Sequence, residues 1–202
     1  MKKLKVLVAC EYSGTVRDAF IVKGHDAISC DLLPTDETGP HYQGDVFDII
    51  NDGFDLMIAH PPCTYLTVSA NKWYKDQPER KSGTLVGSAR REAREEAIGF
   101  FLKLYNCGIP HIAIENPIGI LSSRFRKPDQ VLQPWMFGHG ETKATCLWLR
   151  GLPLLKPTDI VDGREQKMHL LPKTADRWKL RSVTYQGIAN AMVEQWSEYL
   201  TR

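Results

Sequence analysis

The stretch that decides the fold of this chain is Leu56-Met57-Ile58-Ala59-His60-Pro61-Pro62-Cys63. Four consecutive apolar residues without polar alternation are typical of a strand buried on both faces, as in a parallel sheet. The two prolines that follow remove two backbone donors and fix φ, so they predict a rigid exit from the strand. A side chain carried on such an exit, here the thiol of Cys63, is placed accurately.

A second apolar run, Ile112-Ala113-Ile114, leads into Glu115-Asn116-Pro117. Ligands of open α/β sheets bind outside the carboxyl ends of the strands. The sequence therefore predicts a thiol and a carboxylate at one edge of the sheet, a nucleophile and an acid suited to attack on a heterocycle that is protonated as it is attacked. A cysteine is more often a small buried hydrophobe, and a glutamate can simply pair at a strand end, but the rigid mount of Cys63 favours the catalytic interpretation.

The rest of the chain extends this pattern into an α/β fold with a doubly wound, mostly parallel sheet. The turn Glu11-Tyr12-Ser13-Gly14 separates the first strand from the first helix, and long loops are expected at Leu32–Gln43 and Thr64–Ser88. Strands are expected at Lys5–Ala9, at Asp26–Cys30 ending at Asp31, before Pro61, at His111–Ile114 and at Cys146–Leu149, and helices at Thr15–Lys23, at Arg90–Tyr105 and over a final segment marked by Ile188, Met192, Trp196 and Leu200.

The bulk properties indicate an ordinary soluble globular protein. The chain has 202 residues, 43% hydrophobic and 25% charged, which is enough for one domain with a sizeable core. Five cysteines without CxxC spacing indicate neither a zinc site nor a disulfide framework, so we expect a reducing, cytoplasmic setting and no metal. No signal peptide and no run long enough to span a membrane is evident, and the net charge of +2 does not exclude nucleic acid as a partner.

Two features point to ligands beyond the thiol and carboxylate. An acidic residue such as Asp31 at the end of the second strand commonly takes ribose hydroxyls, although a solvated loop acid fits the spacing equally well, and the absence of a P-loop favours an adenosine-containing cofactor. Between Thr64 and Arg94, basic residues alternate with aromatic ones, a pattern that fits a phosphate backbone and unstacked bases slightly better than a solvated face diluted by acids. The basic and aromatic residues there are Lys72, Trp73, Tyr74, Lys75, Arg80, Lys81, Arg90, Arg91 and Arg94.

Taken in order, the motifs of this chain resemble those of the DNA cytosine-C5 methyltransferases, most closely short phage- or prophage-type members. Pro61-Pro62-Cys63 resembles the family's nucleophile motif, Glu115-Asn116 its Glu-Asn motif, and Gly44-Asp45-Val46 the motif whose acid contacts the cofactor adenine. Gly187–Ala191 resembles the last motif, which returns to the cofactor pocket, and Phe137–Leu149 resembles a diverged Gln/Arg motif with Glu141, Lys143 and Thr145 at its polar positions. The turn Cys10–Gly14 departs from the family's Phe-x-Gly-x-Gly.

The resemblance implies a Rossmann-like methyltransferase sheet over residues 1–150 and 182–202, with a minimal recognition insert at 151–181. It implies transfer of a methyl group from S-adenosylmethionine to C5 of a flipped cytosine in double-stranded DNA, with Cys63 adding to C6 and Glu115 protonating N3. The implied catalytic residues are Cys63, Glu115, Pro62 and Asn116; the cofactor residues are Glu11, Tyr12, Ser13, Gly14, Asp31, Leu32, Asp45, Val46, Pro61 and Asn190.

The expected nucleic-acid contacts are Lys72, Trp73, Arg80, Arg90, Lys143, Arg164 and Arg177, with Lys167, Lys173, Lys179 and Arg181 as further candidates. So small an insert predicts a recognition site of about two to four bases. The alternatives are a tRNA cytosine-C5 methyltransferase and a non-catalytic nucleic-acid-binding module of the same fold. A monomer is favoured, although the sequence does not fix the oligomeric state.

Overall fold

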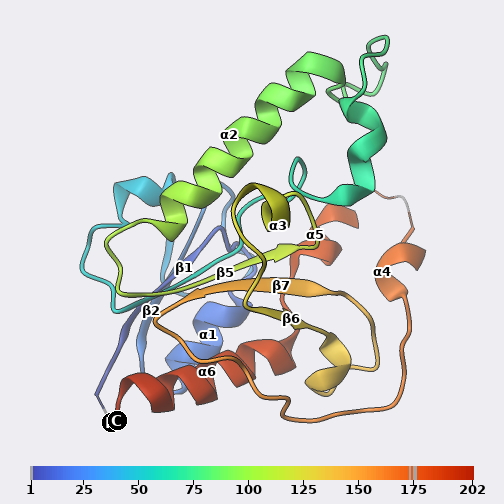
Figure 1. The fold of residues 1–202 in the computed structure, drawn as a ribbon. Coiled ribbons are helices and arrows are strands. Elements are labelled where there is room, and N and C mark those ends of the chain that lie inside the picture. The colour runs from blue at the N-terminus through green and yellow to red at the C-terminus, as the bar shows by residue number, and fades with distance from the viewer. Residues whose placement is uncertain (1, 173, 175–176) are drawn as a thin grey trace.

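The computed structural model describes residues 2–172, 174 and 177–202, except the side chains of residues 168 and 169. Within these residues, a seven-stranded sheet with the order β3-β2-β1-β4-β5-β7-β6 forms the centre of the molecule (Figure 1). The strands are β1 (Lys5–Ala9), β2 (Asp26–Asp31), β3 (His41–Gln43), β4 (Leu56–Ala59), β5 (His111–Pro117), β6 (Gln130–Leu132) and β7 (Thr145–Arg150). The first five strands run parallel, and β7 runs antiparallel to both neighbours. The predicted fold class, doubly wound and mostly parallel, is confirmed.

The chain starts in the middle of this sheet, and that start positions the site. It runs outward from β1 to β2 and β3, then returns to the other side of β1 as β4 and continues to β5. The strand order therefore reverses between β1 and β4, and the crevice at their carboxyl ends is where such sheets bind ligands. Cys10 and His60 begin the two segments that leave the sheet at this point.

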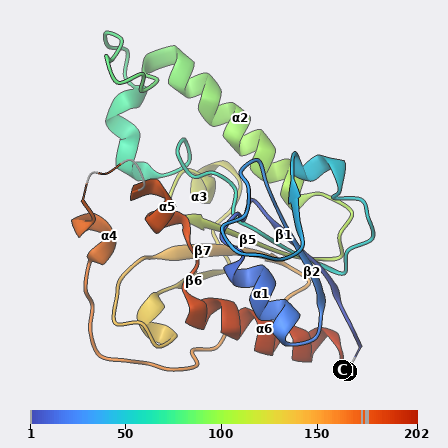
Figure 2. The ribbon, with the colours of Figure 1, turned by 180° about the vertical axis from the view of Figure 1, so that it is seen from behind.

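Helices cover both faces of the sheet, as Figures 1 and 2 show. One face is covered by α2 (Gly87–Tyr105), the other by α1 (Thr15–Val22) and α6 (Gln186–Leu200). The shorter elements are α3 (Leu121–Arg124), α4 (Lys167–Leu170), α5 (Arg177–Ser182) and the 3-10 helices η1 (Val46–Asp48), η2 (Val68–Tyr74) and η3 (Pro134–Met136). No helix in the described part of the chain is long and apolar enough to cross a membrane.

Successive residues of the central strands serve two separate hydrophobic cores. Val6 and Val8 of β1 pack in the core that holds α1 and α6, and Leu7 and Ala9 pack in the core that holds α2. Because side chains alternate between the faces of a strand, a strand buried on both faces must be apolar throughout. Burial of the central strands on both faces therefore explains the unbroken apolar runs in the sequence.

The structure corrects three boundaries. The expected loop Leu32–Gln43 ends in the edge strand β3, and the expected loop Thr64–Ser88 contains η2 and the first residues of α2. Glu115 and Asn116 belong to β5 and do not follow it, because β7 pairs with this strand as far as Pro117. Strand β6, which pairs only with β7, was not predicted.

A buried arginine holds the loop between β2 and β3. Arg17 of α1 is fully buried and donates from Nη1 to the hydroxyls of Ser29 and Thr35 and from Nη2 to the carbonyl of Glu37. A Cβ atom added at Gly39 would lie 2.7 Å from Cζ of Arg17, and one added at Gly14 would lie 2.4 Å from its Nη2. The loop therefore rests directly on the guanidinium.

The segment 151–165 packs into the same core as the sheet. Leu155 is buried there, and Trp196 of α6 donates from its indole nitrogen to the carbonyl of Pro153. The domain division at 151 and 181 stays a prediction, and Lys173 lies outside the described residues.

Candidate active site

Cys63 lies directly after the Pro61-Pro62 exit from β4, as the sequence predicts. Its carbonyl accepts from the amides of Leu66 (3.0 Å) and Thr67 (3.1 Å), so the chain turns tightly behind the thiol. The thiol lines a pocket of about 130 Å³ together with Glu115 of β5. The structure therefore brings together the thiol and the carboxylate that the sequence predicted at the ends of two strands.

Glu115 has a hydrogen-bond partner, His60, for which the sequence predicted no role. Ala59 pairs with Ile114 in the parallel ladder, so the next residue of each strand stands beside the other. Nδ1 of His60 lies 2.9 Å from Oε2 of Glu115. The signal that could have found this pair is the register of the two strands, since both side chains follow the last paired residues.

The electrostatics of this pair favour an imidazolium and a carboxylate. Burial opposes the charge on His60, but its hydrogen bond to Glu115 and the charge of that carboxylate outweigh burial and raise the pKa of His60 above its usual value. Burial likewise opposes the charge on Glu115, while the bond to His60, the charges of His60 and Lys143 and a bond to Thr145 together lower the pKa of Glu115.

Two cations stand near the thiol. Burial and the charge of Glu115 raise the pKa of the Cys63 thiol, while Arg181 and Lys143 act in the opposite direction. Lys143, expected on the nucleic-acid surface, instead lines the pocket, donates to the carbonyl of Val183 (3.2 Å) and has a pKa that burial lowers. Arg181, which lies in α5 much later in the sequence than Cys63, lines the same pocket.

Asn116 ties the second strand to the proline exit. Its Nδ2 donates to the carbonyl of Pro61 over 2.8 Å, and the residue is buried. Pro61, expected to contact the cofactor, lines the thiol pocket. Asn116 therefore fixes the distance between the segments that carry Cys63 and Glu115.

A second cavity of about 480 Å³ adjoins the first. It gathers four of the residues expected to bind the cofactor, namely Asp31, Leu32, Asp45 and Val46, and its further wall comes from Ala93, Ala97 and Phe100 of α2. Asp31 accepts from the amide of Leu33 (2.9 Å) and Asp45 from the amide of Phe47 (3.0 Å), each through Oδ1.

The two cavities share Cys10 and Pro62 in their walls. Cys10 takes a left-handed backbone (φ 58), a conformation uncommon outside glycine and found at functional turns. Burial raises the pKa of the Cys10 thiol far above its ordinary range. We therefore assign Cys10 to the wall between the cavities and not to nucleophilic chemistry.

The turn after β1 does not line the second cavity, contrary to expectation. Glu11 is buried and accepts from the amides of Val16 (2.7 Å) and Arg17 (3.2 Å), so its carboxylate caps α1. Tyr12 bonds through its hydroxyl to the carbonyl of Lys179 and to Ser182, holding α5 against the turn. Glu11, Tyr12 and Ser13 line the thiol pocket. Gly14 (φ 74) is the N-cap residue of α1.

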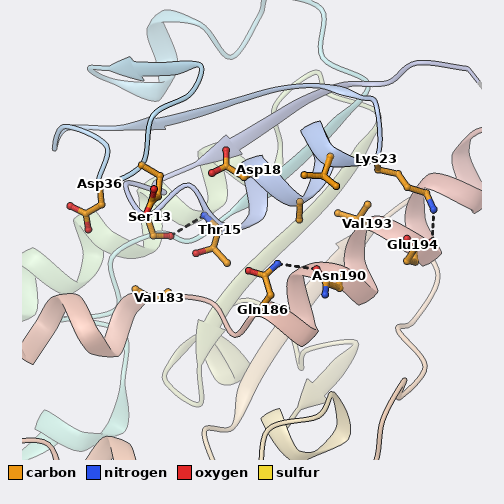
Figure 3. A pocket seen from close by; sticks show the side chains of 13 residues that line it. Ser13, Thr15, Asp18, Lys23, Asp36, Val183, Gln186, Asn190, Val193 and Glu194 are labelled. Atoms are coloured by element: carbon orange, nitrogen blue, oxygen red, sulfur yellow. Dashed lines mark hydrogen bonds and ion pairs between the residues drawn. The ribbon is translucent and has the colours of Figure 1, made fainter.

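Asn190 lies elsewhere. It lines a third cavity of about 880 Å³, which opens between α1 and α6 and is shown in Figure 3. There its Oδ1 accepts from Gln186 of the same helix over 2.9 Å. The cavity wall carries Asp18, Asp36, Glu37 and Glu194. Asn190 therefore lies apart from Asp31 and Asp45, because α6 packs on α1, and its role as a cofactor residue stays a prediction.

The predicted nucleic-acid residues divide into exposed and structural ones. Trp73 carries two cations on its ring, Nζ of Lys72 at 4.6 Å and Cζ of Arg80 at 3.8 Å from its centre. Arg90 is only 3% exposed and donates to the carbonyls of Thr64 and Leu85, so it anchors the loop and is not available to phosphate.

The remaining candidates lie in the 151–181 segment. Arg164 stacks on Trp135 at 3.9 Å, and Arg177 begins α5. Lys167 pairs with Glu141 and Lys179 with Asp36. These cations stay predictions as nucleic-acid contacts.

The fold and these cavities define a class: a Rossmann-like α/β protein with a thiol–carboxylate pocket beside a cofactor-sized cavity. No protein-family model matches the sequence, and no curated protein matches it. Among solved structures, the Entamoeba histolytica methyltransferase EhMeth is similar, with 13% sequence identity and a TM-score of 0.48 over 87% of this chain and 62% of that chain. The present chain thus spans less than two thirds of that protein's length, and a likeness of this size leaves the activity to be inferred from the site.

Proposed function

We propose that this chain is an S-adenosylmethionine-dependent methyltransferase that acts on C5 of cytosine in double-stranded DNA. The observation that carries the proposal is the pair of adjoining cavities, one with the thiol of Cys63 beside Glu115 and one with Asp31 and Asp45, divided by a wall of Cys10 and Pro62. A methyl donor in the second cavity lies next to a base in the first.

The second cavity fits the adenosine part of the cofactor. Its volume of about 480 Å³ falls within the usual range for small-molecule sites. Asp31 and Asp45 use one oxygen each for local turns, which leaves the second oxygen of each to accept from ribose hydroxyls or an adenine amine. Val46, Ala97 and Phe100 provide apolar contact for a flat ring. When bound, the cofactor supplies an electrophilic methyl group.

The chain's own residues make C5 of the base nucleophilic. The thiolate of Cys63 forms a bond to C6, the C5–C6 double bond shifts to C4–C5, and the displaced electron pair reaches N3. Glu115 delivers a proton to N3 and so neutralises the charge that develops there. Lys143 and Arg181 stabilise the thiolate before attack. Since the base must meet both side chains at the sheet edge, it has to leave the stacked duplex.

The surface around the thiol supports a polynucleotide substrate. The segment η2 follows Cys63 closely and carries the half-buried Trp73 with two cations over its ring, a basic and aromatic cluster suited to a polynucleotide. Arg91 and Arg94 hold this segment to α2 through the carbonyls of Tyr74 and Tyr65. Segment η2 is therefore held in a fixed position relative to the pocket that contains the Cys63 thiol.

The decisive experiment is bisulfite sequencing of DNA from cells that express the protein. We expect methylcytosine in a short motif with the wild type and none with Cys63→Ser. Cys107→Ser, a cysteine that lines neither cavity, is the matched control and should behave as the wild type. A duplex with 5-fluorocytosine should trap a denaturation-resistant adduct with the wild type and with Cys107→Ser only.

Competition separates the substrate classes. If tRNA suppresses methylation of duplex DNA at equal concentration and is itself methylated more efficiently, the substrate is RNA. A Cys63→Ser variant with wild-type turnover would refute the proposed mechanism, and a wild type that neither binds S-adenosylmethionine nor methylates either polymer would refute the function.

A further inference from the structure

Two buried histidines of this protein are held in opposite ways. His25 accepts at Nδ1 from the amide of Leu4 (3.2 Å) and contacts the hydroxyl of Ser197 at Nε2 (2.7 Å). Both nitrogens have neutral partners, and burial lowers its pKa. This is the arrangement of a structural histidine that stays neutral.

Within the described part of the chain, His60 has a carboxylate on one nitrogen and no hydrogen-bond partner on the other. Its side chain is 9% exposed, Nδ1 lies 2.9 Å from Glu115, and Nε2 is buried without a hydrogen-bond partner among the residues described. A buried polar atom without a partner is costly, so a histidine selected for stability alone is expected to be satisfied on both sides, as His25 is.

The charges around His60 favour the imidazolium. Glu115 faces it from β5 and Glu11 from the turn after β1, while Lys143 opposes from the segment before β7. Cys63 and Arg181 line the same pocket. Burial and Lys143 lower the pKa of His60, but the hydrogen bond to Glu115 and the two carboxylates raise it above its ordinary value, while the pKa of Glu115 is lowered, so a proton shared by the pair favours the imidazole.

This distribution creates a requirement for the proposed function. Glu115 must deliver a proton to N3 of the base, yet as the partner of an imidazolium it is ionised before the base enters. A donor that is already hydrogen-bonded to Glu115 can supply this proton without a further rearrangement of the pocket. Of the described side chains, His60 and Thr145 hydrogen-bond to Glu115, and only the imidazolium carries an acidic proton.

We propose that His60 is a proton-holding positioning residue, which orients ionised Glu115 in the free pocket and supplies, through Glu115, the proton that N3 receives as Cys63 adds to C6. This inference rests on the proposed function. His60 does not touch the base itself; it acts through the carboxylate.

The step balances in protons and electrons. The thiolate sulfur gives its electron pair to the new bond to C6, and the π electrons move through C4–C5 to N3. Glu115 passes a proton to N3 from one oxygen while the other oxygen takes the Nδ1 proton of His60. The products are a neutral imidazole, an ionised Glu115 and a neutral enamine, so a thiolate and an imidazolium are consumed together.

The first test needs no activity. In the ligand-free protein, titration of ¹⁵N-labelled histidines by NMR should show His60 with a pKa above the ordinary value of about 6.5. Glu115→Gln should lower that pKa, while His25 should titrate below the ordinary value in both proteins. A His60 that titrates at or below the ordinary value, or one that Glu115→Gln does not shift, overturns the inference.

The second test uses His60→Asn, whose side-chain amide can donate to Glu115 from about the position of Nδ1 but holds no acidic proton. We expect kcat and the rate of adduct formation on 5-fluorocytosine DNA to fall about 10²-fold, in the range of general acid catalysis, with KM for DNA and the unfolding midpoint little changed. The ionisation of His60 should disappear from the pH profile of kcat. A His60→Asn enzyme with wild-type kcat and pH profile overturns the inference.

The two tests separate this inference from the proposed function. An ion pair seen by NMR in a protein that methylates no polymer overturns the proposed function, and with it the delivery to N3. An active wild type without the ion pair overturns only the role of His60.

Discussion

Asp45 has two expected roles, one in stability and one in cofactor binding. Different substitutions at this position separate the two. Its Oδ1 caps η1 by accepting from the amide of Phe47 over 3.0 Å, and the residue also lines the 480 Å³ cavity. Asp45→Ala should therefore cost about 0.5–2 kcal/mol of unfolding free energy through the lost cap. It should also weaken S-adenosylmethionine binding by about 1–3 kcal/mol, the cost of leaving a bonded group without its partner, which raises Kd by about 5- to 150-fold.

Two further variants resolve these effects. Asn caps a helix as well as Asp does, so Asp45→Asn should keep the stability of the wild type and lose only the charge offered to the cofactor. Asp48→Ala removes an exposed carboxylate of the same 3-10 helix that bonds to Tyr42 and lines neither cavity. It should change Kd by no more than about twofold.

Calorimetric titration with S-adenosylmethionine and urea denaturation measure the two quantities separately. The expected result is a raised Kd for Asp45→Ala, an unchanged Kd for Asp48→Ala, and a lowered unfolding free energy for Asp45→Ala but not for Asp45→Asn. If Asp45→Ala is destabilised while its Kd equals that of the wild type, Asp45 is only a cap and the cofactor site has been assigned to the wrong cavity.

Three other outcomes follow from single side chains. Trp73→Ala should weaken duplex DNA binding by about 1–3 kcal/mol per stacked base, measured by fluorescence anisotropy, without changing cofactor affinity; unchanged DNA affinity would remove η2 from the interface. Because burial and Lys23 lower the pKa of His25, the folded state takes up this proton less readily than the unfolded chain, so stability is greatest above about pH 6.5 and is lost as the pH falls below it; His25→Gln should reduce this slope in urea titrations, and an unaltered slope would contradict it. Phe101→Ala should cost about 3–5 kcal/mol of unfolding free energy, since the ring is fully buried against the edge of Trp148; a loss below about 1 kcal/mol would mean that the core refills the space.

The sequence predicted those parts of the fold whose patterns are local. The bounds of β1 agree with the expectation, and α1 and α6 are found where their periodicity places them. Strands β3 and β6 were not predicted, because each has only three residues and is stabilised by pairing with a neighbouring strand rather than by its own composition. Glu115 was expected after the end of β5, because no residue near it in the sequence indicates that pairing with β7 extends β5 as far as Pro117.

The same division holds for the candidate site. Cys63, Glu115 and Asp31 were predicted because the ends of strands can be read from the sequence and the strands converge at one edge, whereas Asp45 was predicted only from the resemblance of its motif. The contact of His60 with Glu115 depends on the register between two strands, which a single sequence does not display. The cavity that Asn190 lines depends on which helix α6 packs against, and this tertiary contact is not visible in the motif.

The buried guanidinium of Arg17 links the residues at positions 14, 17 and 39. A side chain at 14 or at 39 would collide with it. Position 39 has an ordinary backbone, so what bars a side chain there is the proximity of Arg17 alone, whereas Gly14 is also required by its left-handed φ. Loss of Arg17 would remove the contact that excludes a side chain at 39 and would take one hydrogen bond each from Ser29, Thr35 and Glu37. Ser29 would keep its bond to His41, and the carbonyl of Glu37 would keep the hydroxyl of Thr35. The effects of substitutions at 14, 17 and 39 should therefore depend on one another, and so should the position of the loop that begins at Leu32 in the wall of the 480 Å³ cavity.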